Sequence, residues 1–76
     1  MIKEHDCVVL TRDLVAESLK AGDIGTVVHV HGKGAGYEVE FITLSGETVT
    51  VVTLLPPQVR PIAPREIAHV RALQAA

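Results

Sequence analysis

The sequence predicts an all-β fold, a small barrel of four to five short antiparallel strands followed by a short C-terminal helix. The apolar residues come mostly in short runs of valine and threonine, which is the composition of strands rather than helices. Glycine-rich turns separate these runs at the spacing of tight hairpins. With 76 residues the chain has room for one core, and we expect the barrel over residues 1–62 and the helical tail over residues 63–76.

The first three strands are expected at residues 7–11, 26–31 and 37–44. Residues 12–21 form a connecting loop with one helical turn near Leu14, and Gly22 suits a turn that needs positive φ. Residues 32–36 form a hairpin loop between the second and third strands. Because side chains alternate between the faces of a strand, a period of two assigns these residues to the interior: Val8, Leu10, Val28, Val30, Val39 and Phe41.

The fourth strand is expected at residues 48–54, after a tight turn at residues 45–47, with Val49 and Val51 pointing inward. Pro56 and Pro57 end it, since proline cannot donate a ladder hydrogen bond. Residues 59–62 then form a short closing strand at an edge. Four or five short strands joined in this way predict a closed or partly closed barrel.

The C-terminal helix is predicted by Pro64, which fits a first helical turn, and by the apolar spacing that follows. Ile67, Val70 and Leu73 recur every three residues and would form one narrow apolar stripe. We expect this stripe to cover the barrel, to pack on a neighbour such as a second copy in a homo-oligomer, or else the tail to stay frayed.

Charge and cysteine content limit the functional classes. The net charge is −2, and the seven lysines and arginines are scattered, which disfavours nucleic acid as a partner. An RNA-binding alternative would depend on a small set of basic residues: Lys20, Lys33, Arg60 and Arg65. A single cysteine cannot form an intramolecular disulfide, and neither a signal peptide nor a membrane span is recognisable, so we expect a cytoplasmic protein that does not bind membranes.

Histidines and glutamates form the only group of reactive or metal-binding side chains that the sequence pattern brings together. His29 and His31 share one side of the second strand, and Glu38 and Glu40 share one side of the third, so a hairpin would place imidazoles near carboxylates. His29 and His31 are thus weak candidates for metal ligands, whereas ordinary cross-strand pairs are the simpler interpretation. Cys7 has no evident base or oxyanion hole, and we expect neither an enzyme nor a cofactor.

Protein binding is the leading functional interpretation. The chain has two aromatic residues: Phe41, assigned to the core, and Tyr37, expected to be exposed at a strand edge. One exposed ring is too few to bind a polyproline peptide or to stack the bases of a single-stranded nucleic acid. An acidic strand surface would steer a basic protein electrostatically. We therefore expect a non-catalytic interaction module whose contact residues are Tyr37, Glu38, Glu40 and Glu47.

Residues 19–30, LKAGDIGTVVHV, together with YEVEF at residues 37–41, resemble a family of small stand-alone bacterial proteins known only as a domain of unknown function. The resemblance covers residues 1–62 and implies an SH3-like barrel without an established activity. It also implies a protein partner encoded nearby, as expected for an antitoxin or immunity protein.

Two broader families share the Gly22-Asp23-x-Gly25-x-Val27 spacing. It is similar to the KOW motif of ribosomal and transcription-elongation proteins, although the basic residues around the glycines are missing here. It is also similar to the SH3-like domain of the nitrile hydratase β subunit, which implies an accessory subunit. A homodimeric building block is a further alternative.

Overall fold

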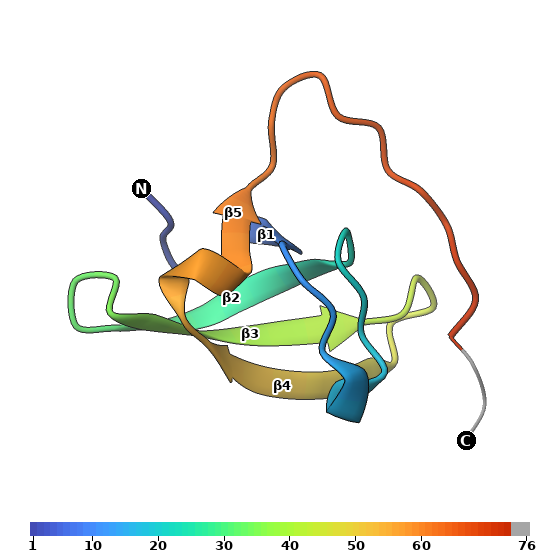
Figure 1. Cartoon of the computed structure of the whole chain (residues 1–76), viewed down its shortest axis with the longest axis horizontal. Helices are drawn as coiled ribbons and strands as arrows, with labels where there is room; N and C mark the ends of the chain where they lie inside the picture. The colour runs from blue at the N-terminus through green and yellow to red at the C-terminus, as the bar shows by residue number, and fades with distance from the viewer. Residues whose placement is uncertain (74–76) are drawn as a thin grey trace.

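Five antiparallel strands form one strongly curved sheet in a computed structural model that describes residues 1–73 (Figure 1). The strand order is β4-β3-β2-β1-β5. The bounds are β1 Cys7–Leu10, β2 Ile24–His31, β3 Gly36–Ile42, β4 Thr48–Leu54 and β5 Val59–Pro61, with 3-10 turns η1 at Val15–Glu17 and η2 at Pro56–Gln58. The predicted all-β class and the antiparallel strands are confirmed, and the expected helical turn in the first loop corresponds to η1.

The sheet does not close into a barrel. β4 and β5 are its two edges, and the pairings found within residues 1–73 include none between them. Pro56 and Pro57 in η2 separate the two strands and lack the N–H groups that a closing ladder would use.

The core fills the concave side of the sheet. Val8, Leu10, Val39 and Phe41 are buried as predicted, and they pack with Leu19, Val27, Tyr37, Leu54 and Val59. β2 crosses this core closely at Gly25, where a Cβ atom would lie 2.5 Å from Val39 Cγ1. Only glycine fits there without displacing the core.

Two inward assignments are wrong, and a β-bulge explains each. In β2, Val27 lies opposite Val39 and His29 opposite Glu38, so Val28 is an extra residue and turns outward. In β4, Phe41 lies opposite Thr50 and Ile42 opposite Thr48, which makes Val49 the extra residue. Val51 consequently shares the outward face with its partner Glu40 and is 50% exposed.

The predicted C-terminal helix is also wrong over the described part of the tail. Residues 62–73 contain one turn and no helix, and residues 74–76 of the expected tail lie outside the described part. A helix of about ten residues is marginal in water unless an apolar face is buried. Ile67 and Val70 remain 94% and 72% exposed, so nothing supplies that burial.

Two ion pairs hold the tail instead. In β5, the two terminal guanidinium nitrogens of Arg60, Nη1 and Nη2, donate to the Glu66 carboxylate. The tail then arcs away from the sheet and returns beside the turns at the other end (Figure 1), where Arg71 Nε donates to Asp23 Oδ1 at 2.8 Å. Among residues 1–73 there is no helix long and apolar enough to cross a membrane. The division into residues 1–62 and 63–76 stays a prediction.

Candidate functional site

The outward face of the β2–β3 hairpin gathers the histidines and glutamates that the sequence singled out. Antiparallel pairing places His29 directly opposite Glu38 and His31 opposite Gly36, two positions further along the hairpin. His31 Nε2 lies 2.7 Å from Glu38 Oε2. The expected approach of imidazole and carboxylate across these strands is therefore present.

Glu38 is the most strongly held carboxylate of this face. Its Oε2 atom accepts a hydrogen bond of 2.6 Å from Thr53 Oγ1 on β4, in addition to the contact with His31. The Thr53 hydrogen bond, followed by that of His31, lowers the pKa of Glu38 from its ordinary value of 4.5. Glu38 is thus ionised and fixed between two strands at neutral pH.

His29 extends the cluster toward the N-terminus. Its Nδ1 atom lies 3.6 Å from Glu4 Oε2, and its ring meets that of His31 edge to face with centroids 4.8 Å apart. Glu4 was not predicted, because no periodic pattern connects the residues before β1 with β2. The backbone of the next residue explains the contact, since His5 N–H donates to the Val27 carbonyl at 2.7 Å.

This cluster does not assemble a metal centre. Throughout residues 1–73, no group of three or more histidine, cysteine, aspartate or glutamate side chains is arranged to hold a metal ion. The weak metal candidates His29 and His31 instead have separate carboxylate neighbours, Glu4 and Glu38. The arrangement can form ion pairs with protonated imidazoles and accept hydrogen bonds from a ligand.

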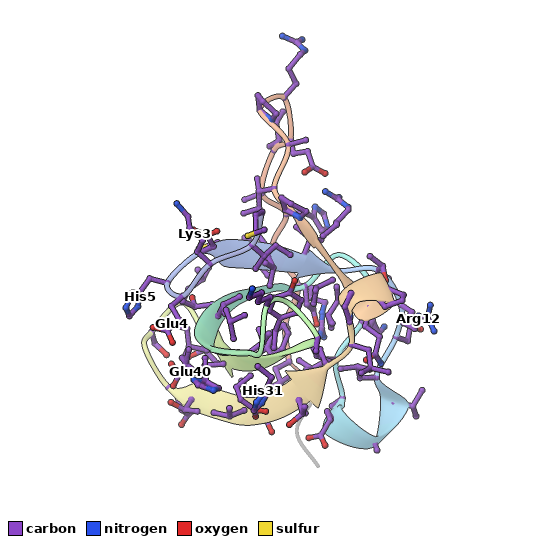
Figure 2. All side chains as sticks on the ribbon, turned by 90° about the vertical axis from the view of Figure 1, so that its left-hand side faces the viewer. Lys3, Glu4, His5, Arg12, His31 and Glu40 are labelled. Atoms are coloured by element: carbon purple, nitrogen blue, oxygen red, sulfur yellow. The ribbon has the colours of Figure 1, made fainter. Side chains whose placement is uncertain are left out.

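Glu40 lies further along β3, and Glu47 lies beyond the end of that strand. Glu40 Oε2 accepts a 2.9 Å hydrogen bond from Thr48 Oγ1 at the start of β4. Glu47 is exposed in the turn between β3 and β4, and its carbonyl accepts the Thr43 N–H. Figure 2 shows Glu4, His31 and Glu40 along one side of the curved sheet, with Arg12 on the other side of the view.

The expectation of an exposed Tyr37 is wrong. Tyr37 is only 7% exposed and belongs to the core cluster. It lies on the same face of β3 as Val39 and Phe41, because these residues alternate with Glu38 and Glu40. Its hydroxyl lies close to the β2–β3 turn, 3.2 Å from where a Cβ atom of Gly34 would be.

The other candidate residues are dispersed. Ile67 is fully exposed, while Val70 and Leu73 line a 410 Å³ groove with Leu19, Ile24, Phe41 and Ile42. Of the basic residues proposed for RNA, Arg60 is paired with Glu66 on the β5 side. Lys20 and Lys33 lie in separate loops and Arg65 in the tail, so they form no common basic patch by position in the fold. Cys7 has an exposed, free thiol.

Comparison with known proteins identifies a family. The model of a family described as "Domain of unknown function (DUF4926)" matches residues 4–61, which end at the last residue of β5. No curated protein and no solved structure matches the chain. The matched range contains every strand of the described structure, the His29–His31 pair and the four glutamates of the candidate site, and it excludes the tail.

Proposed function

The chain belongs to the DUF4926 family, and we propose on that premise that it is a non-catalytic module that binds a basic partner protein. The binding surface is the acidic face, which we define as Glu4, Glu38 and Glu40 on the outward side of the sheet, with Glu47 at its margin. Tyr37 is not part of it, because its ring is buried.

The observation that carries this proposal is the preorganised state of Glu38. Thr53 and His31 hold its carboxylate on two rigid strands, while its side chain keeps 26% of its surface exposed. A charged group fixed before binding loses less conformational entropy when a partner arrives. Thr48 restrains Glu40 in the same way.

Electrostatics favour a basic partner. Three carboxylates lie on this face, and the imidazoles between them carry full charge only after protonation. Complementary charge raises the association rate and suppresses acidic competitors. We expect the interaction to weaken as salt increases, since exposed charges are screened over about 8 Å at physiological ionic strength.

The proposal also covers the type of barrel, the location of the protein and the gene that encodes its partner. We propose that the curved sheet is an open SH3-like barrel in a bacterial cytoplasmic protein. Its partner would be encoded nearby, with this chain acting as an antitoxin, an immunity protein or an accessory subunit. The five short antiparallel strands and the strong curvature of the sheet support the first part, and the acidic face supports a protein partner.

The test is recovery of a partner from the native host by the tagged protein, followed by rebinding of that partner in pure form. The double variant Glu38→Gln with Glu40→Gln removes two negative charges from the acidic face. Its matched control, Ala16→Lys with Ala68→Lys, changes the net charge equally at exposed positions in the first loop and in the tail. We expect the first variant to weaken binding at least tenfold and the control to retain it.

Two results would overturn the proposal. Equal loss in both double variants would mean that only net charge matters. Recovery of RNA that is sensitive to nuclease, with no protein surviving the treatment, would favour the RNA-binding alternative.

A further inference from the structure

β4 leaves one full edge of the sheet without a strand partner. It pairs with β3 on one side, and it stands at the end of the strand order. None of the other backbone hydrogen bonds formed within residues 1–73 involves a residue of Thr48–Leu54. The main-chain groups on its outer side are therefore available for a further strand.

The sequence of β4 favours pairing rather than preventing it. Its residues are TVTVVTL, with no charge, proline or glycine, and most are β-branched. Proteins usually protect an edge with charges, proline or a very short strand. The opposite edge follows that rule, because β5 has three residues and ends at Pro61.

One side-chain contact reaches β4 from the first loop. Thr50 Oγ1 donates to Glu17 Oε2 at 3.2 Å. This contact uses a hydroxyl group and leaves the main chain of β4 unpaired, and Val51 beside it stays 50% exposed.

We propose that β4 pairs antiparallel with β4 of a second copy of this chain, about a two-fold axis at Val51. In this register Val51 lies opposite Val51, Thr50 opposite Val52, and Val49 opposite Thr53 of the other copy. Directly opposed residues share a face of an antiparallel sheet, so the inward residues of both copies stay on one side. The result is one sheet that continues through both molecules.

The residue types of β4 favour a second copy as the occupant of this edge. β4 itself carries no charge, so a second β4 opposes valine and threonine with valine and threonine and brings no charged residue into the new strand pair. The acidic side chains nearest the seam are Glu17, Glu38 and Glu40, whose carboxylates accept hydrogen bonds from Thr50, Thr53 and Thr48 of the same chain. These contacts use hydroxyl groups and leave the main chain of β4 free for a second strand.

Cysteine cross-linking tests both the edge and its register. In a Cys7→Ser background, Val51→Cys places two thiols on the axis with Cα atoms about 4.5–5.5 Å apart, within disulfide range. Thr53→Cys is the matched control, on the same strand and face, but its two copies are four residues out of register, about 13 Å apart. We expect mild oxidation to convert most of the Val51→Cys protein into a reducible dimer and little of the control.

The oligomeric state of the protein without added cysteines provides the second measurement. Sedimentation should show a dimer for the wild type and a monomer for Val51→Lys, with unchanged circular dichroism. A wild type that stays monomeric at millimolar concentration would overturn the proposal, as would equal cross-linking at residues 51 and 53. A dimer that dissociates on Ile67→Ser with Val70→Ser but survives Val51→Lys would place the interface on the tail and overturn it too. None of these outcomes depends on the basic partner, so the two proposals fail separately.

Discussion

Val28 shows that one extra residue in a strand can reverse the face that the alternating pattern predicts. The alternation of polar and apolar residues identifies β2, but it cannot reveal a bulge, because the extra residue is set by how two strands pair. A run of consecutive valines at residues 27 and 28 leaves the choice of the inward residue open in the sequence. In the structure Val27 is the inward residue, because it lies opposite the buried Val39 of β3.

A matched pair of substitutions tests this assignment. Val27→Ala and Val28→Ala remove the same atoms from adjacent positions, but Val27 is fully buried and Val28 is 42% exposed. We expect Val27→Ala to lower the free energy of unfolding by about 2 kcal/mol, from lost burial and a cavity. Val28→Ala should change it by less than about 0.5 kcal/mol.

Urea denaturation followed by circular dichroism measures both changes. Equal destabilisation by the two variants, or a larger effect at Val28, would contradict the bulge. Such a result would mean that β2 alternates without a bulge and that Val28 points inward, as the sequence predicts.

The candidate site was predictable where it depends on one hairpin. His31 and Glu38 come together because the turn at residues 32–36 fixes the register of β2 and β3. Glu4 and Thr53 were not predictable in the same way, since they reach the site from the N-terminus and from β4. Tyr37 was misplaced although the period of two that assigns Val39 and Phe41 to the interior also assigns Tyr37 to it.

At the scale of elements, the strands were easier to predict than the tail. β4 has the predicted bounds, and the other strands differ from prediction only at their ends, because strand composition and glycine turns are local signals. The helical spacing in the tail is also local, but it needs a surface to pack against. Two ion pairs fix the path of the tail instead: Arg60 with Glu66, and Arg71 with Asp23.

The attachment of the tail should depend on pH. The hydrogen bond from Arg71, above all, lowers the pKa of Asp23 from its ordinary 3.8. A lowered pKa means that attachment is complete above the ordinary value and is lost as the pH falls through the lowered one. The Arg60 hydrogen bonds lower the pKa of Glu66 to about 2, so the contact near β5 should be lost only as the pH falls toward about 2.

Amide chemical shifts of residues 68–73 measured by NMR between about pH 7 and pH 2 report this release. We expect the wild-type shifts to stay constant down to about pH 4.5 and then to approach those of Arg71→Gln, which should not change in this way. Identical tail shifts of the two proteins at neutral pH would show that Arg71 does not hold the tail.

At the scale of the whole molecule, the acidic face and the β4 edge combine. Val51 shares the outward face of the sheet with Glu40, so β4 pairing would place the acidic faces of two copies on the same side. Two such faces joined rigidly can engage a surface that carries several basic sites at once. Two joined sites can exceed the affinity of one by about 10²–10⁴ without any new contact.

This combination predicts a difference between crowded and isolated ligands. A lysine- and arginine-rich peptide immobilised at high density should bind the wild type at least about 100-fold more tightly than the same peptide free in solution. For Val51→Lys, the two affinities should agree within a few fold, because a monomer presents one acidic face. The comparison uses the ratio of surface to solution affinity within each protein, so the charge of the new lysine cancels. A ratio near one for the wild type would mean that the paired faces do not act together, even if each proposal holds alone.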